Sequence, residues 1–393
     1  MSTDQSSIEH FSLSEGGPFD RALTKLHLHD KQRTIAVAAL CITWLPLVLL
    51  TGIEGTLYSG GQTSFLYDIA MQARLLLAMP LLVLIKLAID SKVIVVTRYL
   101  SEALMNEEER EHILTTALQR AAKWTNSTLT EIILLLMVIA TTAIFVQGGV
   151  YTGLRAGTGS WMATSREGSQ TLTYAGYWAI FISIPFFQFL LSRWLWRYFV
   201  WILLLFRLSK AKLNLLPTHA DRAGGLGIIL LAQRSFNLFF LTGSVLISGG
   251  LITRLIQNPD SFNTIRSEMI GYVVLCLVLL IGPLFFFTGK LVRAKNEGLL
   301  HLSHLGATLS RQFEKEWVND LPGEKGITEK KPDPSMIYDY SGIYDSLQLL
   351  RVIPITPRDI ISMALTLFAP FIPILFIHFS VAELLQRILK LLV

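Results

Sequence analysis

Seven stretches of about 20 mostly apolar residues dominate this sequence and restrict what the chain can fold into. A helix of that length crosses the ~30 Å hydrocarbon layer of a bilayer. Only 16% of the residues are charged, against about 25% in soluble domains, so the sequence predicts an all-α, polytopic transmembrane helical bundle. The predicted spans cover residues 35–52, 69–89, 129–146, 175 to beyond 191, 235–253, 269–288 and 360–379.

The distribution of Lys and Arg indicates how these spans are oriented. Most of the 34 basic residues flank the spans on the side that also holds the N-terminus, and basic flanks stay in the cytoplasm. We therefore predict about seven spans with the N-terminus inside. Arg387 and Lys390 in the tail would also fit better inside, and Pro370 and Pro373 would allow the seventh span to be re-entrant.

The spans divide the chain into regions along the sequence. These are a cytoplasmic N-terminal segment (1–33), spans one and two (34–90), cytoplasmic amphipathic helices (91–127), spans three to six with the cytoplasmic loop 208–226 (128–292), cytoplasmic helices and a linker (293–358), and span seven with an amphipathic tail (359–393).

The cytoplasmic segments carry helical patterns of their own. Asn106 followed by three glutamates is typical of a helix start, and Leu114, Ala117, Leu118 and Ala121 then repeat at helical spacing. Span six should also continue into the cytoplasm, because apolar residues keep that spacing as far as residue 317. Long helices are therefore expected to extend into a cytoplasmic helical layer.

Three further segments carry expectations about regularity. Residues 175–216 contain one proline and no glycine after residue 176, which predicts a single helix about 63 Å long. Residues 321–335 are typical of a flexible linker, since they are rich in Pro, Gly and charge. The outer loop 148–173 is rich in Gly, Ser and Thr and is expected to be irregular.

The cytoplasmic loop 217–227 is the most distinctive stretch of the chain. Thr218 and Asp221 fit a capping box, in which a hydroxyl and a carboxylate accept from the free amides of a helix start. Arg222 together with exposed amides could instead hold an anion. The loop is therefore either a tightly packed turn between helices or a ligand site, with candidate residues Thr218, His219, Asp221, Arg222, Gly224 and Gly225.

The loop also carries a resemblance. The run His219-Ala-Asp-Arg-Ala-Gly-Gly-Leu-Gly, with Phe65-Leu-Tyr-Asp and Arg74-Leu-Leu-Leu-Ala-Met-Pro-Leu-Leu, resembles a group of uncharacterised bacterial multi-pass membrane proteins. These motifs cover about a tenth of the chain. The resemblance implies a multi-pass protein of the bacterial inner membrane and no particular activity.

Charged residues inside the predicted spans are candidates for function. Arg74 lies within span two, where a charge costs ~2.5–3.5 kcal/mol on insertion scales, so it marks either an ion path or a side chain reaching the outer headgroups. Arg193 and Arg197 alternate with aromatic residues, which indicates either an interfacial aromatic belt or an anion-attracting inner vestibule. Lys86 and Glu131 are expected at the inner interface.

Two prolines break the seventh predicted span. Pro370 and Pro373 interrupt the hydrogen-bond ladder near mid-membrane, as in transporters that present free backbone groups to ions. A kinked packing helix is the alternative.

These features give two hypotheses for function. The first is an ion channel or small-ion transporter, with an anion favoured by the arginines and with Pro370 and Pro373 on its path. The second is a non-transporting sensor or scaffold whose cytoplasmic helices bind a partner protein. A homo-oligomer in a lipid bilayer is expected, and no cofactor, metal site or nucleic-acid partner is predicted; a membrane enzyme ranks last because no catalytic constellation is evident.

Overall fold

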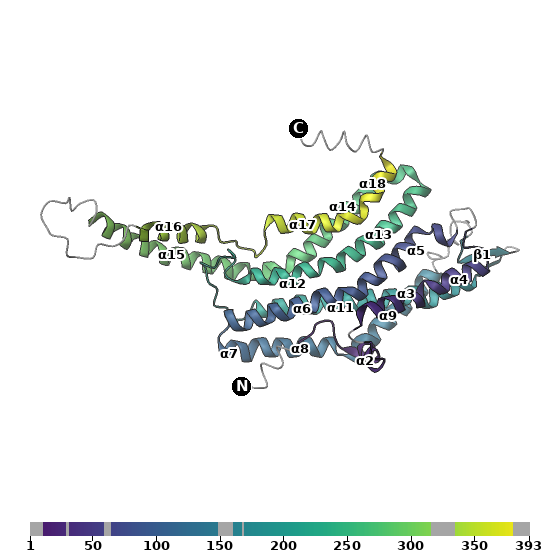
Figure 1. Ribbon diagram of the computed structural model, residues 1–393, viewed down its shortest axis with the longest axis horizontal. Coiled ribbons are helices and arrows are strands. Elements are labelled where there is room, and N and C mark those ends of the chain that lie inside the picture. The colour runs from purple at the N-terminus through teal and green to yellow at the C-terminus, as the bar shows by residue number, and fades with distance from the viewer. Residues whose placement is uncertain are drawn as a thin grey trace.

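The protein is an elongated bundle of long helices, most of them aligned with its long axis (Figure 1). The computed structural model describes residues 11–28, 31–58, 64–147, 160–166, 169–315 and 335–379. Within these ranges, six helical runs are long and apolar enough to cross a membrane, which confirms the all-α polytopic bundle. The six runs are Gln32–Ile53, Thr128–Gln147, Tyr174–Leu208, Leu226–Gln257, Phe262–Phe313 and Pro357–His378.

The remaining predicted span, residues 69–89, is not among these six runs. It belongs to a continuous helix from Ile69 to Leu104, about 54 Å long, which consists of α5 (Ile69–Gln72), the π-helical turn η2 (Ala73–Ala78) and α6 (Met79–Leu104). This helix lies in the interior of the bundle, where α6 packs against α3 (Gln32–Thr43), α11 (Ile184–Leu208), α12 (Ile229–Ser235) and α13 (Asn237–Gln257).

The other elements complete the bundle in chain order. They are α2 (Gly17–Lys25), α4 (Leu45–Ile53), η1 (Phe65–Tyr67), α7 (Glu107–Glu109), the π-helical turn η3 (Arg110–Thr115), α8 (Thr116–Thr125), α9 (Thr128–Gln147), β1 (Ala163–Arg166), β2 (Ser169–Leu172), α10 (Tyr174–Trp178), the π-helical turn η5 (Ala179–Ser183), η6 (Leu226–Ile228), η7 (Pro259–Ser261), α14 (Phe262–Ile281), η8 (Gly282–Phe287), α15 (Thr288–Phe313), α16 (Ser335–Gln348), α17 (Pro357–Phe368), η10 (Ala369–Phe371) and α18 (Ile372–His378).

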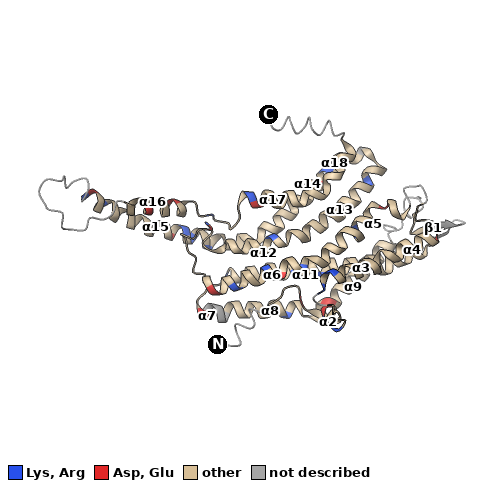
Figure 2. Ribbon diagram, viewed as in Figure 1, with Lys and Arg blue, Asp and Glu red and all other residues tan. Residues whose placement is uncertain are grey.

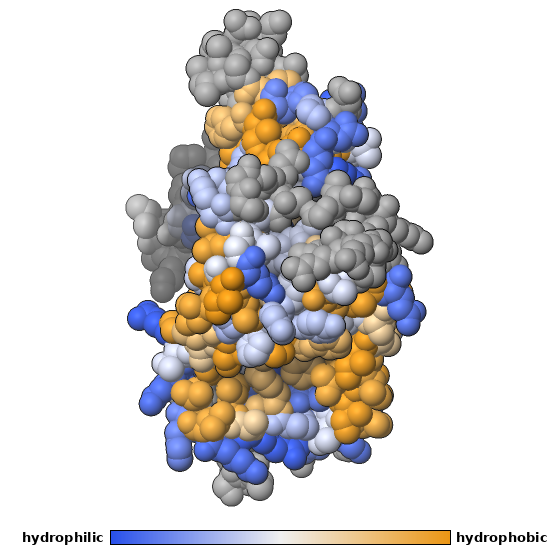
Figure 3. Space-filling view, turned by 90° about the vertical axis from the view of Figure 1, so that its right-hand side faces the viewer, coloured by the Kyte–Doolittle hydropathy of each residue, from blue (hydrophilic) through white to orange (hydrophobic). Residues whose placement is uncertain are grey.

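The segments predicted to be cytoplasmic lie in the part of the molecule that runs from α2, near the middle of its length, to α15 and α16, and we call this part the inner end (Figure 1). Helices α7, α8, α15 and α16 lie there, while β1 and α4 lie toward the opposite, outer end (Figure 1). Figure 2 shows few charged residues along α3, α4 and α5 and more along α15, α16 and around α2. Seen from the outer end, apolar residues cover much of the two sides of the lower half of the molecule (Figure 3). Lipid can solvate such faces.

The helices of the inner end follow the sequence patterns closely. Residues 107–125 are helical, and Leu114, Ala117, Leu118 and Ala121 are all buried, as their spacing predicted. The fifth run, which holds the sixth predicted span, has 52 residues from Phe262 to Phe313 and is about 78 Å long, so span six does continue far beyond the bilayer thickness. Its distal half, α15, pairs with α16; these two helices together are the arm.

Helix breaks caused by proline are repaired by side chains of a neighbouring helix. Pro46 has no amide hydrogen for the carbonyl of Ile42, and the indole Nε1 of Trp178 donates to that oxygen at 3.0 Å. The hydroxyl of Ser183 donates to the next carbonyl, that of Thr43, at 2.7 Å. A broken backbone ladder is tolerated in a membrane only when other donors replace the missing ones.

The same repair occurs at the break between α14 and η8. Pro283 cannot donate to the carbonyl of Leu279, which accepts instead from the hydroxyl of Tyr198 at 2.7 Å. The buried Gln233 donates to the carbonyl of Leu280 at 2.6 Å and accepts from the Trp201 indole at 2.8 Å. Tyr198 and Trp201 lie on α11, and Trp178 and Ser183 lie on α10 and η5 of the same helical run, so one run binds both proline breaks.

Two expectations from the sequence are wrong. The helix predicted for 175–216 ends at Leu208, because the backbone after it forms hydrogen bonds with other parts of the fold. The ammonium of Lys290 binds the carbonyl of Ala211, and the amide of Asn214 donates to the carbonyl of Leu104 at 2.8 Å. The outer loop is not wholly irregular, because β1 and β2 form an antiparallel hairpin. Its strands are four residues long and half of their residues are Ser or Thr, so they lack the apolar alternation that marks a strand.

The seventh predicted span reaches the outer end. Run Pro357–His378 bends through the 3₁₀ turn η10 at Pro370, and the His378 ring stacks on Phe262 at the start of α14, 3.7 Å between ring centroids. The tail with Arg387 and Lys390 and most of the predicted linker 321–335 lie outside the described residues.

Candidate functional site

Two arginines of α11, Arg193 and Arg197, are buried near the inner end of the bundle. They are four residues apart, so they lie on the same face of the helix, one turn from each other. Each is only 6% exposed. A buried charge must be paired, which makes the partners of these arginines the central question for the site.

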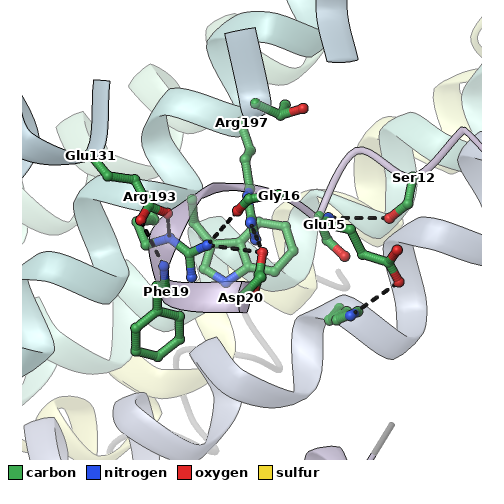
Figure 4. A network of polar contacts seen from close by, with 12 residues as sticks. Ser12, Glu15, Gly16, Phe19, Asp20, Glu131, Arg193 and Arg197 are labelled. Carbon is green, nitrogen blue, oxygen red and sulfur yellow. Dashed lines mark hydrogen bonds and ion pairs between the residues drawn. The ribbon is translucent and has the colours of Figure 1, made fainter. Parts of the chain in front are cut away.

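The arginines converge on carboxylates from two other segments. Asp20 Oδ2 accepts from Nη2 of Arg193 at 3.0 Å and from Nη2 of Arg197 at 2.8 Å, while Nε of Arg193 pairs with Glu131 Oε1 at 2.9 Å (Figure 4). Arg193 also donates to the carbonyl of Gly16 at 3.2 Å. The two positive charges are therefore balanced by Asp20 of α2 and Glu131 of α9.

Asp20 belongs to an N-terminal segment that docks against the inner end. We call residues 11–25 the latch. Its backbone and side chain at Ser14 both donate to the carboxylate of Asp90, and its Glu15 pairs with Lys86 at 3.2 Å. The amide of Phe19 donates to Glu131 at 2.9 Å. Polar contacts thus join the latch to α6, α9 and α11 at the same time.

Apolar side chains add to this docking. Phe11 and Leu13 are buried, with 4% and 0% of their surface exposed, and belong to the main core of the bundle. The ring of Phe19 lies against the guanidinium of Arg193, 4.6 Å from its centroid, as a cation–π pair. Burial of a Leu or Phe side chain from water stabilises by roughly 1.5–3 kcal/mol, so the latch binds through its apolar residues as well as its charges.

Two consecutive glycines allow the latch to approach this closely. Gly16 and Gly17 have φ values of 117° and 88°, a region that favours glycine. A Cβ at Gly17 would lie 2.4 Å from Oε1 of Glu131, and one at Gly16 would lie 2.2 Å from Oδ1 of Asn126. Neither position has room for a side chain while the latch is docked.

A cavity of about 440 Å³ lies beside the docked latch. It is open to the outside of the protein and lies between the latch and α8. Latch residues Glu15, Gly16 and Asp20 form one wall, and Leu118 and Asn126 contribute to the other. The carboxylate that holds both arginines is therefore next to an opening at the inner end.

The loop 217–227 forms a second conspicuous polar structure, separate from the arginine pair. Asp221 Oδ1 accepts from the amides of Ala223 (2.8 Å) and Gly225 (3.1 Å), and Oδ2 accepts from the amide of Gly227 at 2.9 Å. His219 Nδ1 lies 2.8 Å from the same carboxylate. Burial alone would raise the pKa of Asp221, but these hydrogen bonds outweigh it and the pKa is lowered.

The capping box predicted for this loop is wrong in one respect. Asp221 does accept free backbone amides, but these belong to the loop itself and to η6 rather than to an α-helix start. Thr218 is exposed, and Arg222 is exposed with a φ of 51°. Gly224 and Gly225 are buried and also have positive φ. The loop is thus a tight turn organised by one carboxylate.

This turn joins the bundle to the arm. Arg351 lies just beyond α16 and donates two hydrogen bonds to the turn. Its guanidinium donates to the carbonyl of Asp221 at 2.5 Å, and its backbone amide donates to the carbonyl of Arg222 at 2.8 Å. The hydroxyl of Tyr99 on α6 lies 3.3 Å from Nε2 of His219. The loop is consequently held between the end of α6 and the base of the arm.

The remaining predicted residues lie elsewhere, around α13. Arg74 is partly buried in the π-helical turn η2, while Pro370 lies within η10 and Pro373 in α18 just after it. Both η2 and η10 pack against α13, and Ser248 of that helix donates to the carbonyl of Pro370 at 2.5 Å. The predicted ion-path residues therefore form two groups, the arginine pair of α11 and the turns beside α13.

Sequence reasoning missed the residues that complete the arginine site. The sequence places Asp20 only in a cytoplasmic segment, and it predicts Glu131 and Lys86 at the interface. The sequence does carry a weak signal. Glu15 and Asp20 lie on either side of Gly16-Gly17-Pro18, at the start of a strongly amphipathic helix. Within the described residues, no three His, Cys, Asp or Glu side chains gather as a metal site would require.

Comparison with known proteins adds no relative from which a role could be transferred. No protein-family model matches this chain, and no curated protein or solved structure matches it. The geometry and the six apolar runs together describe a multi-pass membrane protein with a docked N-terminal segment and a protruding helical arm.

Proposed function

We propose that this protein is a membrane-embedded scaffold or sensor whose cytoplasmic arm binds a partner protein. The observation that carries the proposal is the arm itself, which extends away from the bundle at the inner end (Figure 1). Its base is braced by the Asp221 loop through Arg351. A helical pair held in this way presents its outer surface in a fixed orientation relative to the membrane.

The surface of the arm supports a role in binding. Apolar side chains that the described residues leave exposed lie on both of its helices. They are Leu300 (61% exposed), Leu305, Met336, Tyr338 (80% exposed) and Ile343. Exposed apolar groups outside lipid favour association with another protein surface, and a second copy of this chain in a homo-oligomer is included among such partners.

The arginine site favours this proposal over ion transport. A vestibule that attracts anions needs uncompensated positive charge. Arg193 and Arg197 are already paired with Asp20 and Glu131. The resemblance of the Asp221 loop supports the bacterial inner membrane as the proposed location.

The experiment compares the protein partners of matched variants. Full-length protein solubilised from its native membrane is captured, and co-purifying proteins and the mass of the particle are measured. The double variant Leu300→Glu/Leu305→Glu removes apolar surface and adds two charges. The control Ser303→Glu/Thr308→Glu adds the same charges at exposed polar positions of the same helix.

The proposal expects one partner, or a second copy, at constant stoichiometry with the wild type and the control. The Leu300→Glu/Leu305→Glu variant should lose it by about tenfold, which corresponds to ~1.4 kcal/mol of binding free energy. A protein that is captured alone, or a partner that all three proteins retain equally, contradicts the scaffold.

Transport of a small ion is the second candidate, and one observation favours it. The π-helical turn with Arg74 and the 3₁₀ turn at Pro370 both pack against one helix, α13, and π-helical turns are frequent at functional sites. Reconstitution into liposomes tests it: flux of one ion that Arg74→Gln abolishes supports a transporter. Absence of flux over a broad panel of salts contradicts it.

A further inference from the structure

The latch occupies its docking site in the manner of a bound ligand. One oxygen atom, Asp20 Oδ2, accepts a hydrogen bond from each of the two arginines. Asp20 is 173 positions from Arg193 and 177 positions from Arg197 in the sequence. A carboxylate held between two arginines is the arrangement with which proteins bind anionic ligands. Here the chain supplies the anion itself.

Departure of the latch would change the charge of the site. Two carboxylates, Glu15 and Asp20, would leave with it. The groups that remain are three cations and two carboxylates: Lys86, Arg193, Arg197, Asp90 and Glu131. The remaining groups would face the open cavity with a net positive charge, and such a charge favours binding of a replacement anion.

The position of the site indicates the chemistry of that anion. Trp196 directly precedes Arg197 on α11, and Trp124 of α8 lies two residues before Asn126, which lines the cavity. The two indole rings are 6.5 Å apart between centroids, and Arg207 stacks on Trp124. Tryptophan and arginine together mark the level of the headgroups on a membrane protein. Phosphate is the anion of that layer, and its several oxygens can accept from two guanidinium groups at once.

We propose that residues 11–25 are a built-in competitor for an anion site on Arg193 and Arg197. When the latch leaves, a phosphate-bearing anion takes the place of the Asp20 carboxylate. The anion is either the headgroup of an acidic phospholipid or a soluble phosphate, and the two sources share the same contacts. This inference concerns the arginine site and stands independently of any partner of the arm.

A substitution at one of the two latch glycines should release the latch without changing any charge. In Gly17→Ala the new Cβ would collide with Glu131 Oε1 at 2.4 Å, so the latch cannot dock as it does in the wild type. Gly55→Ala is the matched control, since Gly55 also has a positive φ (71°) but nothing lies within 4 Å of its Cβ position. Asp20→Asn removes the competing charge without adding volume, and serves if Gly17→Ala does not fold.

The test measures hydrogen–deuterium exchange of residues 11–25 and phosphate binding in the full-length protein. The probes are inorganic phosphate, compared with chloride at equal ionic strength, and nanodiscs of phosphatidylglycerol, compared with phosphatidylcholine. At least one probe should accelerate exchange of the wild-type latch. Gly17→Ala, or Asp20→Asn in its place, should bind that probe about tenfold more tightly than the wild type and Gly55→Ala, because competition by the latch is removed.

A further variant separates anion binding from latch release. Arg197→Gln combined with Gly17→Ala should keep the latch exposed and lose the response to the probe. A response to phosphatidylglycerol alone assigns the site to a lipid headgroup, and a response to inorganic phosphate identifies a soluble anion. The proposal is overturned if neither probe changes latch exchange, or if a released latch gives no gain in binding.

Discussion

The hydroxyl of Tyr198 donates to the carbonyl of Leu279 at 2.7 Å, the oxygen that Pro283 leaves without a helical donor. Trp178 does the same for the carbonyl of Ile42 opposite Pro46. Prolines in two different spans are thus compensated by a single helical run, Tyr174–Leu208. The compensation explains how the bundle accommodates several breaks while the rest of its backbone stays helical.

This relationship predicts the effect of removing one hydroxyl. Tyr198→Phe should destabilise the protein by about 1 kcal/mol, the usual range for a hydrogen bond within a membrane bundle, when unfolding is measured in detergent. Pro283→Ala restores an amide donor for Leu279. The double variant should therefore lose less stability than the sum of the two single variants, and strictly additive losses would show that the bond does not compensate the proline.

The buried arginine site gives a second prediction. Arg193→Met leaves Asp20 and Glu131 without a shared partner and should cost roughly 3–5 kcal/mol of unfolding free energy. Arg254→Met is the control, because Arg254 and its partner Glu268 are both more than 40% exposed and such pairs contribute about 0–1 kcal/mol. Equal losses in the two variants would mean that the arginine site is not desolvated in the folded protein.

The Asp221 loop predicts a dependence on pH. The pKa of this carboxyl is lower in the folded protein than its ordinary value of about 3.9, so its contribution to stability is complete above that value and is lost as pH falls through the folded pKa. Protection of the Gly225 and Gly227 amides against hydrogen exchange should therefore decrease on acidification below pH ~4. In Asp221→Asn these amides should be less protected at neutral pH and insensitive to acid; an unchanged acid response in that variant would point to another group.

The spans and the helical inner end were predictable from the sequence because their physical causes are local. The length of an apolar stretch predicts a span. The spacing of Leu114, Ala117, Leu118 and Ala121 predicts which face of the helix in residues 107–125 is buried. The carboxylate that cancels the charge of Arg197 could not be predicted in this way, because Asp20 is 177 positions away. Only the fold brings the two residues together.

The other differences have the same origin. The helix after span four ends at Leu208 because the backbone beyond it is bound by Lys290 and by the carbonyl of Leu104, neither of which is near in sequence. The Asp221 loop was predicted as a special turn from its glycines and short polar residues. The loop binds the base of the arm through Arg351, and no sequence pattern predicts this contact.

We infer that this multi-pass membrane protein carries its latch and its arm on the same, cytoplasmic side. Single cysteines test it directly in a Cys41→Ala/Cys276→Ala background, at exposed positions of the latch (Ala22→Cys), the arm (Gly342→Cys) and the outer end (Asn263→Cys). In sealed right-side-out vesicles, a membrane-impermeant thiol reagent should label Asn263→Cys at once, and the other two only after permeabilisation. Labelling of the latch and the arm from opposite sides, or of all three sites in intact vesicles, would contradict the account.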